Sequence, residues 1–340
     1  MELEDFTIFD IFVKKTDLYM ILSINNLPVH ENEICIKYEN QILIPKDKLE
    51  KDLYEPILIF VYDFSNNSNN SNTNFVTITY KKNNYNYFFG VCPQKNKKKI
   101  ALTTLFKYDI FSFPFFYEYY KNQGVEDFYI YYNGKLSDLN QDVFSNKKNV
   151  CLIEWNFRYI NPEKYKYMHH AQLGQIHHSL YKFGKDYYDY MIFCDFDEYF
   201  HIKDQKICDL ITNNPTIDKF VFNNYWCNTL DNRIPKTIDD MKTVICTKHK
   251  EELYNYPLFI SSPQGVTNIN RQFYGRTKNI FKLDHLLLLG VHVDISWNKI
   301  PEVLETDLFM LHFYKWSGNK RKNPSIKELE DRKYFLYNLF

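Results

Sequence analysis

The sequence lacks features that mark several large classes of protein. Its 340 residues include only 9 glycines, and no glycine-rich loop of the kind that cradles phosphate groups is evident. No apolar run is long enough to cross a bilayer, and the first five residues, MELED, are acidic where a secretion signal would be basic. We therefore expect a cytoplasmic protein without a membrane span.

Net charge is absent as well. The 42 lysine and arginine residues balance 42 aspartate and glutamate residues, so no overall field draws the chain toward nucleic acid or an anionic membrane surface. The 7 cysteines are scattered and form no Cys-x-x-Cys pair, which indicates neither a disulfide framework nor a zinc cluster. The composition thus predicts a protein without a nucleic-acid partner.

Aromatic residues, by contrast, are abundant, with 29 tyrosines and 29 phenylalanines. Together with frequent asparagine, lysine and isoleucine, they resemble the composition of proteins from AT-rich genomes, such as those of giant viruses. For such a source, the virion or the viral factory is the alternative location. Because codon supply accounts for these residues, an aromatic side chain is not by itself evidence of a site.

Residues 1–95 are expected to form a small β-rich accessory domain. Strand-type residues fill 29–38, 57–62 and 75–80. The tract at 65–74, SNNSNNSNTN, cannot bury apolar surface and is predicted to be a disordered hairpin loop between the last two strands. An antiparallel sandwich is the expected architecture, with glycan binding, docking or simple support as its role.

Residues 96–340 show a different pattern, in which strand-type and helical segments alternate. The strands are expected at 100–106, 128–132, 150–155 and 190–194, and the helices at 113–122 and 165–183. Such alternation predicts an α/β domain with a mostly parallel sheet flanked by helices. Ligands of these domains bind outside the carboxyl ends of the strands.

An apolar run at 190–200, YMIFCDFDEYF, ends in three carboxylates. Because side chains alternate along a strand, Asp195 and Asp197 point to the same side and Phe196 to the other. Two adjacent carboxylates repel each other unless a cation lies between them. Oxygen ligands favour Mg²⁺ or Mn²⁺, which commonly keep positions open for phosphate oxygens. The motif therefore indicates a metal site for a nucleotide diphosphate.

Two other interpretations of the motif remain open. The acids could form a solvated turn that caps a core strand. The pair could also hold a metal ion in a phosphoryl-transfer or hydrolytic enzyme, although such sites usually add further acids or a glycine-rich phosphate loop.

Residues 172–181, QLGQIHHSLY, followed by 190–200, resemble the signature of family 92 glycosyltransferases and their GT-A relatives. In that signature a glutamine opens a helix, a small residue follows two turns later, and a hydrophobic strand leads into Asp-x-Asp-Glu-aromatic. Gln172 and Ser179 occupy the expected places. Further similarity lies at 115–133 and in KNIF, GVHVD and LHFYKW, which begin at residues 278, 290 and 311.

The resemblance implies a GT-A-type, Rossmann-like domain over residues 96–340. The implied activity is transfer of a sugar from a nucleotide sugar, with a UDP-sugar as the expected donor. The acceptor is expected to be a glycan or glycoprotein, the anomeric configuration to be inverted, and Mn²⁺ or Mg²⁺ to be the cofactor. A catalytically inactive relative that only binds glycans or plays a structural part is the alternative, because a fold does not fix a function.

The resemblance also suggests roles for individual residues. His292 is the first choice for a histidine that binds the metal ion, and His312 is the second. Glu198 is expected to accept hydrogen bonds within the site. The candidate set is Asp195, Asp197 and His292 for the metal ion, Thr103, Asn133, Gln172, Asp195 and Lys278 for the nucleotide sugar, and Asp231 or Asp294 as the catalytic base.

Overall fold

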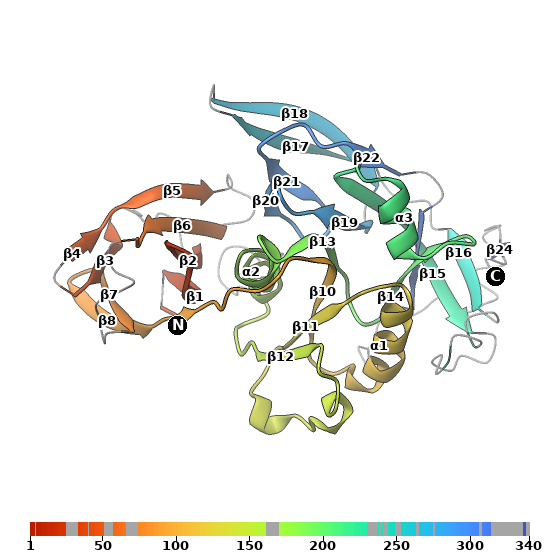
Figure 1. Cartoon of the computed structure of the whole chain (residues 1–340), viewed down its shortest axis with the longest axis horizontal. Coiled ribbons are helices and arrows are strands. Elements are labelled where there is room, and N and C mark those ends of the chain that lie inside the picture. The colour runs from red at the N-terminus through yellow and green to blue at the C-terminus, as the bar shows by residue number, and fades with distance from the viewer. Residues whose placement is uncertain are drawn as a thin grey trace. The chain divides into compact units, whose positions relative to one another are not determined.

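The structure is a computed structural model of the whole chain that divides into two compact units (Figure 1). Unit 1 comprises Met1–Asn96 and Phe157–Tyr187, and unit 2 comprises Lys97–Asn156 and Tyr188–Phe340. Among the residues that the structure describes, no helix is both long and apolar enough to cross a membrane. The described residues are 1–3, 5–24, 33–39, 41–50, 57–65, 74–160, 170–229, 237, 240, 244–248, 253–262, 265–274, 276–305, 308–313 and 336–337.

Unit 1 contains two β-sheets that share one hydrophobic core. All strand pairs are antiparallel except the short parallel pair of β1 with β9. The first sheet has the order β5 (Pro45–Glu50), β6 (Ile57–Asp63), β2 (Asp17–Ile24), β1 (Phe6–Lys14) and β9 (Gly90–Val91). The second has the order β4 (Gln41–Leu43), β3 (Cys35–Tyr38), β7 (Phe75–Tyr80) and β8 (Asn83–Phe88).

The strands expected at 57–62 and 75–80 are confirmed as β6 and β7, but the expected hairpin between them is wrong. β6 pairs with β2 and β5, whereas β7 pairs with β3 and β8 in the other sheet. The tract at 65–74 therefore connects two different sheets, because β6 and β7 each pair with other strands and not with one another. Residues 66–73 lie outside the described part of the chain.

Helix α2 (His170–His178) and the π-helical turn that follows it (Ser179–Gly184) belong to unit 1. The sequence division assigns them to residues 96–340 instead. Every residue of α2 is buried, including its polar ones. His178 Nε2 lies 2.8 Å from Asp10 Oδ2 on β1, and Lys182 Nζ donates to the same oxygen at 2.6 Å. These partly buried polar contacts tie the helix to the first sheet.

The main sheet of unit 2 is mixed, which corrects the expectation of a mostly parallel sheet. Its order is β12 (Val150–Glu154), β11 (Asp127–Tyr132), β10 (Lys98–Phe106), β13 (Tyr188–Phe193), β19 (Lys278–Lys282), β15 (Lys219–Thr229), β16 (Val244–Lys248) and β24 (Leu336–Tyr337). Along this order, β12, β11, β10 and β13 run parallel to one another, and each later strand is antiparallel to the one before it. Parallel pairing needs long crossover connections. In the described part of the chain after β13, only α3 (Ile207–Asn213) is an α-helix.

The remaining strands of unit 2 extend this framework. β14 (Glu198–Ile202) pairs with β23 (Leu308–His312), and both β23 and β22 (Val303–Leu304) pair with β15. A separate sheet has the order β18 (Gly265–Tyr274), β17 (Leu253–Ser262), β21 (Asp294–Trp297) and β20 (Leu286–Leu289). Short 3₁₀ turns lie at Ile110–Ser112, Leu136–Asp138 and Asp142–Phe144.

Helix α1 (Phe113–Asn122) confirms the helix expected at 113–122. Its aromatic side chains join the same core cluster as the strands of the main sheet. Just beyond the end of the helix, Gly124 has a φ of +94°, a left-handed conformation that favours glycine. Gly124 N–H bonds the Lys121 carbonyl at 3.1 Å, and Val125 N–H bonds the Tyr120 carbonyl at 3.0 Å. These two bonds satisfy carbonyl groups at the end of the helix.

We predict that Gly124→Ala destabilises the protein by about 2 kcal/mol or more, because left-handed backbone and overpacking each cost that order of energy. A Cβ atom at this position would stand 2.5 Å from Cys208 Cβ. Gly90→Ala is the matched control, since a Cβ there meets nothing within 4 Å. Urea unfolding measures both, and an equal effect of the two substitutions would contradict the packing argument.

Candidate functional site

The carboxylates singled out in the sequence lie where β13 ends and β14 begins. β13 ends at Phe193, and a tight turn containing Asp195 and Asp197 leads to Glu198, the first residue of β14. β13 borders β10, whose other neighbour is β11. The chain order of the parallel strands therefore reverses between β10 and β13. In open α/β sheets, ligands bind outside the carboxyl ends of the strands at such a reversal.

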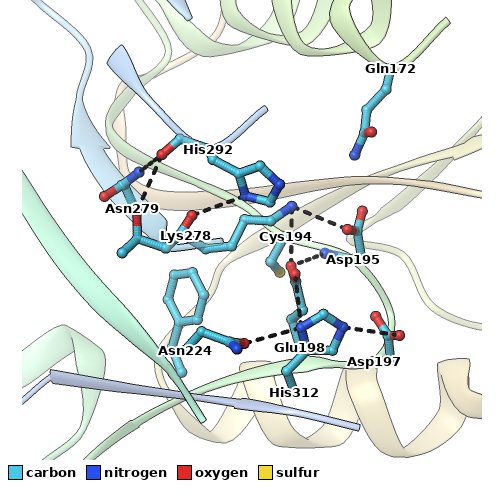
Figure 2. A network of polar contacts seen from close by, with 12 residues as sticks. Gln172, Cys194, Asp195, Asp197, Glu198, Asn224, Lys278, Asn279, His292 and His312 are labelled. Atoms are coloured by element: carbon cyan, nitrogen blue, oxygen red, sulfur yellow. Dashed lines mark hydrogen bonds and ion pairs between the residues drawn. The ribbon is translucent and has the colours of Figure 1, made fainter. Parts of the chain in front are cut away.

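A buried lysine joins two of these carboxylates (Figure 2). Lys278 Nζ lies 3.1 Å from Asp195 Oδ2 and 3.2 Å from Glu198 Oε2. The Asp195 backbone N–H also donates to Glu198 Oε2, at 2.8 Å. Because β19 is antiparallel to β13, with Asn279 opposite Phe193, its first residue reaches this end of the sheet. We call Asp195, Glu198 and Lys278 the carboxylate–lysine cluster.

The cluster has a distinct electrostatic character because most of it is removed from water. The side chains of Lys278 and Glu198 are 3% and 2% exposed, whereas that of Asp195 is 36% exposed. Burial acts to lower the pKa of Lys278, but the two carboxylates raise that pKa well above its ordinary value. Burial opposes ionisation of Asp195, yet the Lys278 ammonium leaves its pKa lowered. Burial raises the pKa of Glu198, with Lys278 opposing the shift.

Asp197 faces a histidine from a distant part of the chain. The pairing of β14 with β23 sets His312 opposite Glu198, and His312 Nε2 lies 3.5 Å from Asp197 Oδ2. The other ring nitrogen, Nδ1, lies 3.1 Å from Asn224 Oδ1, and the ring of Trp226 packs 4.5 Å from the imidazole. Burial acts to lower the pKa of His312, but Asp197 and the other acids raise it overall.

His292, the first choice for a metal ligand, lies beside the cluster but in a different setting. Its Nδ1 is 3.2 Å from the Thr277 carbonyl oxygen, and its own carbonyl accepts a hydrogen bond from Asn279 Nδ2 at 3.1 Å. These contacts fasten the segment around His292 to the start of β19. Figure 2 shows the imidazole of His292 next to Lys278.

The other expected donor-binding residues occupy structural positions. Thr103 Oγ1 donates to the Tyr129 carbonyl at 3.2 Å, and Asn133 Nδ2 donates to the Trp155 carbonyl at 2.9 Å. Both side chains are buried. Gln172 lies on α2 in unit 1, where its side-chain oxygen accepts a hydrogen bond from Tyr159 Oη at 3.1 Å. Their parts in donor binding stay predictions.

The two candidates for the catalytic base differ in what the structure shows. Asp231 lies outside the described residues. Asp294 is 4% exposed; its Oδ1 accepts from Lys219 Nζ at 2.6 Å and its Oδ2 from Trp297 Nε1 at 2.7 Å. Burial opposes its ionisation, but Lys219 and these hydrogen bonds leave its pKa lowered. Because both of its carboxylate oxygens accept hydrogen bonds, a structural role is favoured for Asp294, which lines a cavity of about 70 Å³.

Among the described residues, no group of three His, Cys, Asp or Glu side chains could hold a metal ion. Asp197 and His312 nevertheless direct an oxygen and a nitrogen toward one another. The contact of Nδ1 with Asn224 orients the ring, and metal-binding histidines are commonly oriented by such a bond on their other ring nitrogen. This pair fits a cation that takes its remaining ligands from phosphate or water.

Some residues that shape the site carry no sequence signal. Tyr120 on α1 donates its Oη hydrogen to the Glu198 carbonyl at 2.8 Å and accepts from the Phe200 N–H at 3.2 Å. It thereby fixes the start of β14. Asn224 and Trp226, which hold His312, come from β15. Helix packing brings Tyr120 to the site and strand pairing brings Asn224 and Trp226, so no local pattern could have identified these contacts.

The sequence model of glycosyltransferase family 92 matches residues 100–334, more than half of the chain, including all of the carboxylate–lysine cluster and His312. The chain belongs to glycosyltransferase family 92. A search of curated proteins found no match. As a family 92 glycosyltransferase, the protein uses a sugar donor and an acceptor, and the matched region extends through the strands that carry the acids.

We predict that Lys278→Met destabilises the protein by about 3–5 kcal/mol, the usual cost of breaking a buried ion pair. Lys282→Met is the control on the same strand, because the Lys282 ammonium is bonded to a carbonyl at the surface and exposed substitutions change stability by about 0.5 kcal/mol at most. Urea unfolding at neutral pH measures both variants. Equal losses would show that Lys278 does not compensate buried charge.

The same variant has a predictable pH dependence. Without Lys278, the pKa of Asp195 rises above its value in the unfolded chain, and the pKa of Glu198, which burial already raises, rises further. A group whose pKa is raised by folding favours the folded state at low pH and loses that contribution as pH rises. The stability deficit of Lys278→Met relative to the wild type should therefore shrink as the pH is lowered from about 7 to about 5. A deficit independent of pH would contradict this explanation.

Proposed function

We propose that this family 92 member is a metal-dependent glycosyltransferase that moves a sugar from a UDP-sugar to a glycan or glycoprotein acceptor with inversion. The observation that carries the proposal is the convergence of Asp195, Asp197, Lys278 and His312 at the carboxyl end of β13. Acids, a cation and an imidazole at one strand end suit a diphosphate that is held through a metal ion.

The strand order supports a GT-A-type arrangement for this domain. The parallel strands β12, β11, β10 and β13 give the order third, second, first, fourth along the chain, and β19 then pairs with β13 in the antiparallel direction. Doubly wound nucleotide-binding sheets reverse in the same way and bind the nucleotide at the reversal. We therefore place the donor over the ends of β10 and β13.

Asp197 and His312 are the residues proposed to hold Mn²⁺ or Mg²⁺. A bound divalent ion would supply positive charge that stabilises the diphosphate leaving group. His312 takes the role for which sequence reasoning placed His292 first, because Nε2 of His312 faces Asp197 while Nδ1 of His292 faces a backbone carbonyl. Lys278 keeps Asp195 in place and contributes a fixed positive charge near the donor.

The transfer step follows from these positions. The acceptor hydroxyl oxygen bonds to the anomeric carbon as the bond from that carbon to the diphosphate oxygen breaks on the opposite face, which inverts the configuration. The hydroxyl proton passes to a carboxylate base. Asp231 stays the sequence prediction for that base, because both oxygens of Asp294 are engaged by Lys219 and Trp297.

A second candidate is an inactive relative that binds glycans or plays a structural part. The observation that favours it is the position of Lys278, whose ammonium already compensates Asp195 and Glu198 without any metal ion. An inactive relative would bind neither metal nor nucleotide, so donor turnover separates the two candidates.

We predict that Asp197→Asn lowers Mn²⁺-dependent turnover of the UDP-sugar at least about 100-fold, because a lost charge-stabilising contact costs that much in the chemical step. His312→Gln should lower it as well, and both variants should keep the melting temperature of the wild type within a few degrees. Asp138→Asn, at an exposed position in the same unit, is the control. Wild-type turnover in Asp197→Asn would refute the assignment of the site.

A further inference from the structure

The second sheet of unit 1 exposes one face whose composition is unusual. Its inner face buries Ile36, Val76 and Ile78 in the core shared with the first sheet. Because side chains alternate along each strand, the intervening residues point away from that core. We call them the outer face of the sheet: Cys35, Lys37, Ile42, Phe75, Thr77, Thr79, Asn84, Asn86 and Phe88.

Polar side chains form a strip across the middle of the outer face. Thr77 lies opposite Lys37 on one side and Asn86 on the other, and Thr79 lies opposite Asn84. Thr77 Oγ1 donates to Asn86 Oδ1 at 3.0 Å, and Thr79 Oγ1 donates to Asn84 Oδ1 at 2.8 Å. These two bonds fix the side-chain amides of Asn84 and Asn86 through their oxygens and do not use the side-chain N–H donors. The strip therefore presents donors and hydroxyl oxygens in fixed positions.

Apolar side chains flank the strip at both edges of the sheet. Phe88 on the edge strand β8 is 69% exposed, and Ile42 on the opposite edge strand β4 is 62% exposed. The Phe88 ring lies 5.8 Å from that of Phe75, at 60° to it, so its orientation is set by a neighbour. Natural edge strands usually carry charge instead, because an exposed apolar edge invites association. An exposed aromatic ring that a neighbour holds in one orientation is a feature of ligand-binding surfaces.

The charge of the outer face restricts what that ligand can be. Lys37 is the one charged residue among the nine, and none of them is acidic. A strongly charged partner would meet no complementary field here. Hydroxyl and amide groups beside an aromatic ring suit a molecule that carries both hydroxyl groups and apolar C–H faces, which is the chemistry of a neutral sugar.

We propose that the outer face of the second sheet in unit 1 binds a neutral glycan. Sugar hydroxyls bond the strip formed by Thr77, Thr79, Asn84 and Asn86, and the C–H face of a sugar ring lies on Phe88. The face thus acts as a binding module for the carbohydrate on which a glycosyltransferase works. The proposal concerns binding alone, so it stands or falls independently of donor turnover.

The test is affinity electrophoresis of the full chain in native gels that contain dextran, mannan, glycogen, galactomannan or hydroxyethyl cellulose. We expect at least one of these polysaccharides to retard the wild type. Phe88→Ala and Asn86→Ala should each weaken that binding about fivefold or more, as expected for the loss of one apolar or hydrogen-bonding contact. Phe88→Tyr, which keeps the ring, should retain it.

Ile300→Ala is the matched control, because Ile300 is 65% exposed and lies in unit 2. It should leave the retardation unchanged. Equal melting temperatures of all variants ensure that lost binding does not reflect unfolding. The proposal is overturned if none of the five polysaccharides retards the chain, or if Phe88→Ala and Asn86→Ala are retarded like the wild type. It is also overturned if light scattering shows a dimer that Phe88→Ala dissociates.

Discussion

The ion pairs of the buried Lys278 ammonium with Asp195 and Glu198 are the interactions on which the site depends. Two carboxylates at the end of a core strand would repel each other and lose hydration, but the Lys278 ammonium lies within 3.2 Å of both Asp195 and Glu198. The antiparallel pairing of β19 with β13 delivers that lysine. The antiparallel direction of β19 thus places its first residue, Lys278, at the carboxyl end of β13.

A second long-range pairing completes the arrangement. β23 sets His312 opposite Glu198 and within 3.5 Å of Asp197, while β15 supplies Asn224 to orient the ring. Tyr120 anchors the first residue of β14 from helix α1. Contacts from four separate elements, β19, β23, β15 and α1, therefore converge around the acids of one short turn. A ligand that bridges Asp197 and the carboxylate–lysine cluster would meet groups whose positions the core already fixes.

Sequence reasoning identified the parts of this account that depend on local patterns. Apolar runs predicted β10, β11, β12 and β13, and the helical pattern at 113–122 predicted α1. It could not predict the antiparallel half of the sheet, the packing of α2 with unit 1, or the pairing of Lys278 with Glu198. Those features depend on contacts between residues far apart in the chain, for which a single sequence holds no periodic signal.

The most direct test of the central claim is a titration of the wild-type protein with uridine diphosphate, with and without Mn²⁺, followed by the melting temperature. A ligand that binds only the folded state raises that temperature by mass action. A diphosphate held through a metal ion at Asp197 and His312 predicts an increase that needs both components. No increase with uridine diphosphate and Mn²⁺ together, at concentrations up to several millimolar, would contradict the account.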